Sequence, residues 1–255
     1  MSASAREWDA ATYDRVSDPM VELALGVLER LPLGGHEAVL DAGCGSGRVT
    51  RLLVERLPRG RVVAVDASEA MVELARAELG PDVEVVRADL VDLELHEPVD
   101  AIVSTAVFHW IPDHERLFAR LAAALKPGGR LEAQCGGAGN IARFHATALD
   151  PVTVRPEWAD AFRGWTGPWN FAGPEETTRR LHAAGFEDVR AWLEPRTVRP
   201  GDPAGFLRST VIRQHLERLP AARRDAFAEA VAARAGEPLA LDYVRLNVSA
   251  RKAAA

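Results

Sequence analysis

The sequence predicts an α/β fold, built on a doubly wound, seven-stranded and mostly parallel sheet with a reversed last strand and a helical cap. Short apolar runs alternate with stretches of helical apolar spacing between about residues 36 and 135. The first of these runs leads into a glycine-rich turn, VLDAGCGSG at residues 39–47. Strands separated by helices pair in parallel through right-handed crossovers, and ligands then bind beyond the carboxyl ends of the strands.

The elements expected in the first half of the chain follow in a regular order. Residues 18–31 have apolar residues at helical spacing. The strands expected after them are 38–43, 61–67, 83–90, 99–107 and 130–135, and the helices between these strands are 48–57, 68–79 and 114–125. Ser68 is expected to cap the second of these helices, and the KPGG run at 126–129 is expected to end the third.

The second half of the chain departs from this alternation. Residues 136–174 are rich in Gly, Pro and Trp, whereas residues 200–235 have mostly helical spacing. A helix and a sixth strand are expected within 174–194, and a seventh strand within 239–251. We therefore expect a single domain over residues 1–255. Its core is expected at about 36–135, 175–195 and 240–253, and its cap or lid at 1–30, 136–174 and 200–236.

Composition argues against several classes of protein. The 255 residues carry a net charge of −6 and give a pI of about 5.7, so there is no overall basic footprint for a nucleic acid. No apolar run is long enough to span a membrane, and two cysteines are too few for a disulfide scaffold. We therefore expect a cytoplasmic protein with a small-molecule substrate and neither a nucleic-acid nor a membrane partner. The oligomeric state is left open.

The spacing within the glycine-rich turn distinguishes between kinds of ligand. Dinucleotide-binding turns have the pattern G-x-G-x-x-G, in which Gly43 and Gly45 fill the first two positions. The third position falls on Arg48, whose side chain is too large for the close packing that glycine allows there. The third glycine is instead Gly47, and no Gly-Lys-Ser/Thr follows to make a P-loop. The turn therefore disfavours a nicotinamide dinucleotide.

Two acidic residues end the strands that follow the turn. Asp66 comes about twenty residues later, at the distance where a carboxylate pairs with ribose hydroxyls. Asp89 ends the third strand, where it can accept a hydrogen bond from an adenine amino group. Either residue alone is as well explained as a helix cap. Their order along neighbouring strands favours a nucleoside site.

Four motifs in this order resemble those of class I S-adenosylmethionine-dependent methyltransferases. They are VLDAGCGSG, VVAVDAS, VRADL and DAIVSTAVFHWIPD…LKPGGRL. Looser similarity at both ends, in WDAATYD and VRLNVSARK, is to trans-aconitate methyltransferase-like proteins. The resemblance implies a Rossmann-like sheet, S-adenosylmethionine as the cofactor, and methyl transfer to a small-molecule acceptor. We expect the acceptor atom to belong to a carboxylate or hydroxyl, which makes the reaction an O-methylation.

The resemblance also assigns residues to parts of the cofactor. Asp41 would face the ammonium of the methionine part, Asp66 the ribose diol and Asp89 the adenine amino group. Ser104 would lie near the sulfonium, and Tyr13 would close over the cofactor. The other cofactor-binding residues that it implies are Gly43, Gly45, Gly47, Ala67, Met71 and Leu90.

Methyl transfer from a sulfonium is an in-line displacement that requires alignment and exclusion of water. His109, after the fourth expected strand, is the candidate general base, which is needed only if the nucleophile carries a proton. Trp165, Trp169 and Arg143 are candidates for binding the acceptor, and arginine would suit an acidic one. Core packing explains the aromatic residues equally well, and solvation explains the arginine. No cluster of ligands predicts a metal.

Two other functions remain open on sequence grounds. An NAD(P)-dependent oxidoreductase has a related fold, but Arg48 disfavours it. A non-catalytic S-adenosylmethionine-binding protein would keep the cofactor residues without the chemistry.

Overall fold

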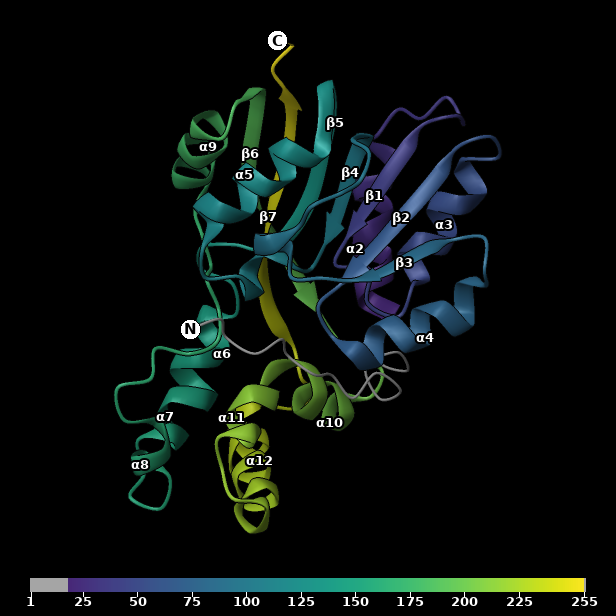
Figure 1. Ribbon diagram of the computed structural model, residues 1–255. Coiled ribbons are helices and arrows are strands. Elements are labelled where there is room, and N and C mark those ends of the chain that lie inside the picture. Colours follow the sequence, from purple (N-terminus) through teal and green to yellow (C-terminus); the bar gives the residue numbers. More distant parts are fainter. Residues whose placement is uncertain (1–17, 255) are drawn as a thin grey trace.

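The computed structural model describes residues 18–254 and contains one seven-stranded sheet flanked by helices (Figure 1). The strands are β1 (Ala38–Ala42), β2 (Arg61–Asp66), β3 (Glu84–Arg87), β4 (Val99–Thr105), β5 (Leu125–Gly136), β6 (Phe186–Val198) and β7 (Leu241–Lys252). Their order in the sheet is β3-β2-β1-β4-β5-β7-β6. Only β7 runs against its neighbours β5 and β6 in this described sheet, and the other pairs are parallel. The predicted sheet with its reversed last strand is confirmed.

Helices cover both faces of the sheet. One face is covered by α2 (Asp18–Glu29), α3 (Arg48–Arg56) and α4 (Glu69–Leu79). The other face is covered by α5 (His114–Ala124) and α9 (Pro174–Ala183), which lie in front of the sheet in Figure 1. This is the doubly wound arrangement that the alternation of strands and helices predicts.

Alternating side chains of the strands enter two different hydrophobic cores. Val39 belongs to the core beneath α2 and α3, together with Leu28 and Leu53. Its neighbour Leu40 belongs to the core beneath α5, together with Leu117. Because both faces are covered, β1 is buried along its whole length, as its continuous apolar sequence predicts.

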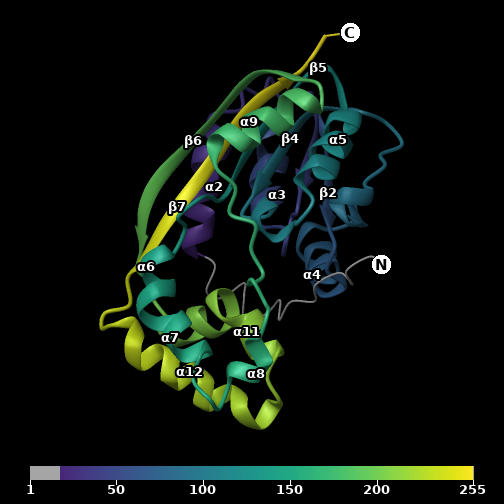
Figure 2. The ribbon, with the colours of Figure 1, turned by 90° about the vertical axis from the view of Figure 1, so that its left-hand side faces the viewer.

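Two segments leave the sheet and pack together as a helical layer, which we call the cap (Figures 1 and 2). It contains α6 (Ala142–Phe144), α7 (Asp150–Thr153), α8 (Ala159–Phe162), α10 (Pro203–Phe206), α11 (Arg213–Glu217) and α12 (Ala221–Ala235), with π-helical turns at His145–Leu149 and Leu207–Val211. Its core is built around Trp158, Phe206 and Phe227. Leu241 and Tyr243 of β7 join the same core, so the cap is anchored on the end of this strand.

Several strand boundaries differ from the predicted ones, and the end of β3 and the start of β5 have a clear cause. β3 ends at Arg87, because Asp89 caps a short 3-10 turn at Leu90–Asp92 instead of continuing the strand. β5 begins at Leu125, so the KPGG run at 126–129 lies within the strand, where the pairing of β5 with β4 shifts its register. Proline and glycine thus mark an irregularity in a strand here, and not only the end of a helix.

Candidate functional site

The glycine-rich turn connects the end of β1 to the start of α3. The N–H groups of Gly43 and Cys44 both donate to the carbonyl oxygen of Val65, at 2.8 and 2.9 Å. These bonds fix the turn against the end of β2. The turn therefore lies at the carboxyl edge of the sheet, where parallel sheets bind their ligands.

The three glycines of the turn are required for different reasons. Gly43 and Gly47 both have a φ of +88°, and an added Cβ would meet Val107 at 2.2 Å in the first case and Leu79 at 3.0 Å in the second. Gly45 has a φ of +54°, but a Cβ there would meet no atom within 4 Å. Packing therefore requires glycine at 43 and the positive φ favours it at 47, whereas Gly45 borders open space that a ligand can approach.

The carboxylate of Asp66 shapes this open edge of the turn. Its Oδ2 accepts a hydrogen bond from the Gly45 N–H at 2.9 Å, and its Oδ1 accepts one from the Ser68 N–H at 2.9 Å. Ser68 in turn caps α4 by accepting from the Met71 N–H at 3.4 Å, as predicted. Asp66 is thus placed beside the turn with a half-buried carboxylate. Its contact with a ribose stays a prediction.

Asp41 is completely buried beneath the turn. Its Oδ2 accepts a hydrogen bond from Oγ1 of Thr50 at 2.7 Å, while its Oδ1 has no hydrogen-bond partner among the described residues. Burial raises the pKa of Asp41 to about 7, and the nearby Asp66 charge acts in the same direction against the Thr50 hydrogen bond. A buried carboxylate oxygen without a partner is suited to a cationic group.

The residues predicted to surround an adenine lie along the next two strands. Asp89 accepts a hydrogen bond from the Val91 N–H at 3.1 Å, so it acts as the cap of its turn. Leu90 and Met71 are buried, and Ala67 is half-buried. The structure brings these residues to the same edge of the sheet as the glycine-rich turn.

The predictions for Ser104 and Tyr13 have different outcomes. Oγ of Ser104 donates to the carbonyl oxygen of Ala42 at 2.7 Å, and this bond ties β4 to β1 beneath the turn. The hydroxyl proton of Ser104 is therefore directed at a neighbouring strand, and its proposed position near a sulfonium stays untested. Tyr13 lies outside the described residues.

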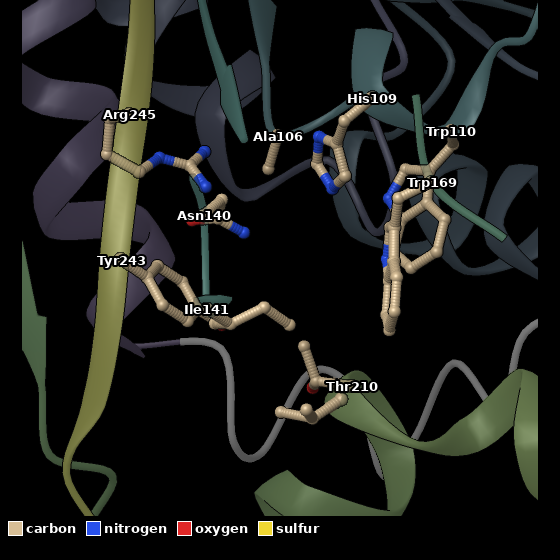
Figure 3. A pocket seen from close by; sticks show the side chains of 10 residues that line it. Ala106, His109, Trp110, Asn140, Ile141, Trp169, Thr210, Tyr243 and Arg245 are labelled. Atoms are coloured by element: carbon tan, nitrogen blue, oxygen red, sulfur yellow. The ribbon is translucent and has the colours of Figure 1, made fainter. Parts of the chain in front are cut away.

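A pocket opens between the carboxyl edge of the sheet and the cap (Figure 3). Its lining residues are Ala106, His109, Trp110, Asn140, Ile141, Trp169, Thr210, Val211, Tyr243 and Arg245. The pocket adjoins the glycine-rich turn, because Val107, next to Ala106, packs against Gly43. Ala106 and Ile141 have φ values of 61° and 51°, a backbone conformation that is uncommon for residues other than glycine and that clusters at active sites.

Backbone N–H groups orient two of the lining side chains. The Gly136 N–H donates to Nδ1 of His109 at 3.2 Å, which leaves the proton of the neutral ring on Nε2. The Val244 N–H donates to Oδ1 of Asn140 at 2.9 Å, and the amide nitrogen of Asn140 points into the pocket in Figure 3. Both side chains therefore act as hydrogen-bond donors. In this tautomer Nε2 of His109 is a donor, and the general-base role of His109 stays a prediction.

Arg245 supplies positive charge to the pocket. It lies on β7 with 2% of its surface exposed, and its guanidinium points into the pocket (Figure 3). Its Nε donates to Oε1 of Gln134 at 3.4 Å, and its guanidinium lies 5.6 Å from the ring centroid of Tyr243. Arg245 is the only permanently charged side chain among the described residues that line the pocket. The pocket therefore favours an anion.

Only one of the three predicted acceptor-binding residues lines the pocket. Trp169 does so, whereas Trp165 stacks on Phe162 within the cap, with ring centroids 5.8 Å apart. The side chain of Arg143 is 64% exposed and donates to the carbonyl oxygen of Ala240 at 3.1 Å. The geometry therefore favours Arg245 over Arg143 as the residue that binds an acidic acceptor.

The sequence did contain a signal for the residues that were missed. The run GGAGN at 136–140 brings the chain so close to its neighbours that a Cβ on Gly136 would meet Phe171 at 2.7 Å, and one on Gly137 would meet Leu246 at 2.7 Å. This close approach sets Asn140 beside β7, opposite His109. A glycine-rich turn at the end of a parallel strand was thus a pointer to the acceptor pocket.

Several kinds of site are not found within residues 18–254. No group of three or more His, Cys, Asp or Glu side chains is placed to hold a metal ion. Cys44 and Cys135 are buried free thiols, and burial raises the pKa of each. In the same part of the chain, no helix combines the length and apolar character needed to cross a membrane.

The sequence is similar to a known domain family and to several known proteins. The profile of a methyltransferase domain matches residues 39–129. A trans-aconitate 2-methyltransferase of an Acidovorax species is 30% identical over 242 residues, which cover 91% of this chain and 90% of the relative. A trans-aconitate 2-methyltransferase of an Azoarcus species is 44% identical over 127 residues, which cover half of each chain. The relatives thus match the cofactor motifs and, in the first case, nearly the whole chain.

Solved structures agree with this relationship at the level of the fold. A phosphoethanolamine N-methyltransferase of Haemonchus contortus, in complex with S-adenosyl-L-methionine, matches with a TM-score of 0.62 at 19% identity. That match covers 96% of this chain and 56% of the other. Together, the sheet order, the glycine-rich turn and the near full-length relatives show that the chain belongs to the class I S-adenosylmethionine-dependent methyltransferases.

Proposed function

We propose that the protein transfers the methyl group of S-adenosylmethionine to a carboxylate oxygen of a small organic acid bound between the sheet and the cap. The observation that carries the proposal is the convergence of Arg245, Nε2–H of His109 and the amide nitrogen of Asn140 on one pocket beside the glycine-rich turn. Three donors, one of them charged, suit a carboxylate.

The residues around the turn fit the cofactor. The unpartnered Oδ1 of Asp41 suits the cationic amino group of the methionine part, and the open space at Gly45 allows close approach of its backbone. Asp66 and Asp89 are suited to accept hydrogen bonds from a ribose diol and from an adenine amino group, respectively. S-adenosylmethionine supplies an electrophilic methyl group, and this chain supplies the position and the surroundings.

The acceptor site favours an acid that has more than one carboxylate. One carboxylate must receive the methyl group, whereas the charge of Arg245 is best matched by another that stays ionised. The relatives named trans-aconitate 2-methyltransferases point to an acceptor of this class, and trans-aconitate is the first compound to test.

The mechanism needs positioning more than proton transfer. A carboxylate nucleophile has no proton to lose, so a general base is not required. We assign His109 and Asn140 to hold the acceptor by donating hydrogen bonds, with Trp110 and Trp169 as apolar walls that limit access of water. Residues of the core and cap act here as one methyltransferase domain, in which the cap covers the acceptor.

The proposal also covers the cellular location of the protein and its partners. An acidic chain with a net charge of −6 suits a cytoplasmic enzyme that acts on small molecules without a nucleic-acid partner. An NAD(P)-dependent oxidoreductase is not favoured, because Arg48 follows the third glycine and Asp41 offers a cation site rather than a phosphate site.

The test is an acceptor screen with purified protein and S-adenosylmethionine. Release of S-adenosylhomocysteine and the mass of the product are measured with trans-aconitate, other di- and tricarboxylates, monocarboxylates, phenols and amines. We expect a methyl ester of a polycarboxylate as the product. Methylation of phenols or amines only would contradict the proposed acceptor, and cofactor binding without any transfer would favour a non-catalytic protein.

A further inference from the structure

A chain of hydrogen bonds leads from Arg245 across the sheet to its outer strand. Nε of Arg245 donates to Oε1 of Gln134 on β5 at 3.4 Å. Nε2 of Gln134 donates to Oδ1 of Asn247 on β7 at 2.9 Å, and Nδ2 of Asn247 donates to Oε2 of Glu194 on β6 at 3.3 Å. The strand register explains these contacts. Gln134 on β5 lies directly opposite Asn247 on β7, and Glu194 on β6 lies directly opposite Arg245 on β7.

The two inner residues of this series of hydrogen bonds, Gln134 and Asn247, are buried polar side chains within the sheet. Gln134 is 6% exposed and Asn247 is fully buried. Both amides are oriented the same way, with the oxygen toward Arg245 and the nitrogen toward Glu194. Their dipoles therefore stabilise the guanidinium charge without cancelling it.

The chemical group that accepts the hydrogen bond from Nε of Arg245 determines how much of the guanidinium charge is available to a ligand. A carboxylate at position 134 would pair with Arg245 and compete with an acidic ligand, whereas a neutral amide orients the guanidinium without neutralising its charge. With Nε held by Gln134, the terminal nitrogens of Arg245 point into the pocket (Figure 3).

We propose that Gln134, supported by Asn247 and Glu194, is the positioning residue that keeps the charge of Arg245 aimed at the carboxylate of the acceptor. This inference rests on the proposed function, since it assumes an acidic acceptor. It predicts that acceptor affinity depends on a residue that does not line the pocket.

The experiment compares Gln134→Glu with the wild type. The substitution is nearly isosteric and supplies a carboxylate to Arg245, so KM for trans-aconitate should rise on the order of tenfold or more. Affinity for S-adenosylhomocysteine, measured by calorimetry, should stay at the wild-type value. Gln134→Met, which removes the acceptor atom without adding charge, should also raise KM.

Ser249→Ala is the matched control. Oγ of Ser249 donates to Oε1 of Glu132 at 2.6 Å, and this pair lies on the same two strands, one step along the same face. The substitution removes a part-buried hydrogen bond that is not connected to Arg245. We expect some loss of thermal stability and an unchanged KM for trans-aconitate.

A double-mutant cycle shows whether Gln134 acts through Arg245. On an Arg245→Ala background, Gln134→Glu should cause no further rise in KM. The proposal is overturned if Gln134→Glu behaves like Ser249→Ala, or if its full effect persists without Arg245.

Failure of the proposed function gives a different pattern. If the wild type binds trans-aconitate without methylating it, the proposed reaction is wrong, but the same variants still test the positioning role through the Kd of trans-aconitate. If the wild type binds no polycarboxylate at all, both proposals fail.

Discussion

Replacing Asp41 with asparagine tests the assignment of a cation site beneath the glycine-rich turn. Burial raises the pKa of Asp41 from its ordinary value of 3.8 to about 7 in the folded protein. Between these values the folded state binds more protons than the unfolded state, so stability falls as the pH rises through this window. At about 1.4 kcal/mol for each tenfold change in proton affinity, the ionised side chain costs about 4 kcal/mol at pH 8.

The Asp41→Asn variant avoids this cost, because an amide does not titrate. The amide oxygen still accepts the hydrogen bond from Thr50, but the buried amide nitrogen lacks a partner, which costs ~1–3 kcal/mol. The variant without cofactor should therefore gain stability relative to the wild type as the pH rises, to a net advantage of ~1–3 kcal/mol at pH 8. Its affinity for S-adenosylmethionine should fall by ~10-fold or more, because the charge that faces the amino group is lost.

The assay is urea unfolding of both proteins at several pH values from about 5 to 8 in the absence of cofactor. The difference between the two unfolding free energies should increase with pH and level off above about 7. Thr50→Val is the control. The hydrogen bond from Thr50 lowers the pKa of Asp41 in the wild type, so its removal should raise this pKa further. The pH range over which stability falls should then extend to higher pH. A difference that does not change with pH would refute the raised pKa, and unchanged cofactor affinity would refute the cation site.

Three further predictions concern the pocket and the turn. Arg245→Ala should lower kcat/KM for an acidic acceptor by ~100-fold through KM. The control is Arg234→Ala, which changes an exposed arginine of the cap and should leave kcat/KM unchanged. A larger loss with Arg143→Ala would favour the assignment from sequence. His109→Gln keeps a donor and should keep kcat within a few-fold, whereas a loss of ~100-fold or more would favour the general-base role. Gly43→Ala should destabilise the protein by ~2–4 kcal/mol in urea unfolding, because the new Cβ meets Val107, whereas Gly45→Ala should cost less stability and mainly weaken cofactor binding.

The fold and the cofactor edge could be predicted because local sequence determines them. Strands such as 38–42 are buried on both faces and read as continuous apolar runs, and glycines with positive φ mark the turn. Asp66 is the last residue of its strand and Asp89 lies two residues beyond its own, so their place at one edge follows from a parallel sheet. One boundary error arose because an aspartate can follow a strand or cap a turn, and Asp89 caps the turn after β3 has ended at Arg87.

The acceptor pocket could be predicted only in part, because it depends on contacts between distant segments. Arg245 is 136 positions after His109 in the chain, and only the antiparallel pairing of β7 with β5 brings the two together. In a chain with so many arginines, nothing local distinguishes Arg245 from Arg143. The distinguishing property is burial, since Arg245 is 2% exposed and needs polar partners that β5 provides.

A crystal structure of the protein with S-adenosylhomocysteine and trans-aconitate would test the central claim most directly. We predict that one carboxylate of the acid contacts the guanidinium of Arg245, with His109 and Asn140 donating hydrogen bonds to the acid. A second carboxylate oxygen should lie in line with the sulfur of the cofactor. An acid bound outside this pocket, or bound with no carboxylate on Arg245, would contradict the account.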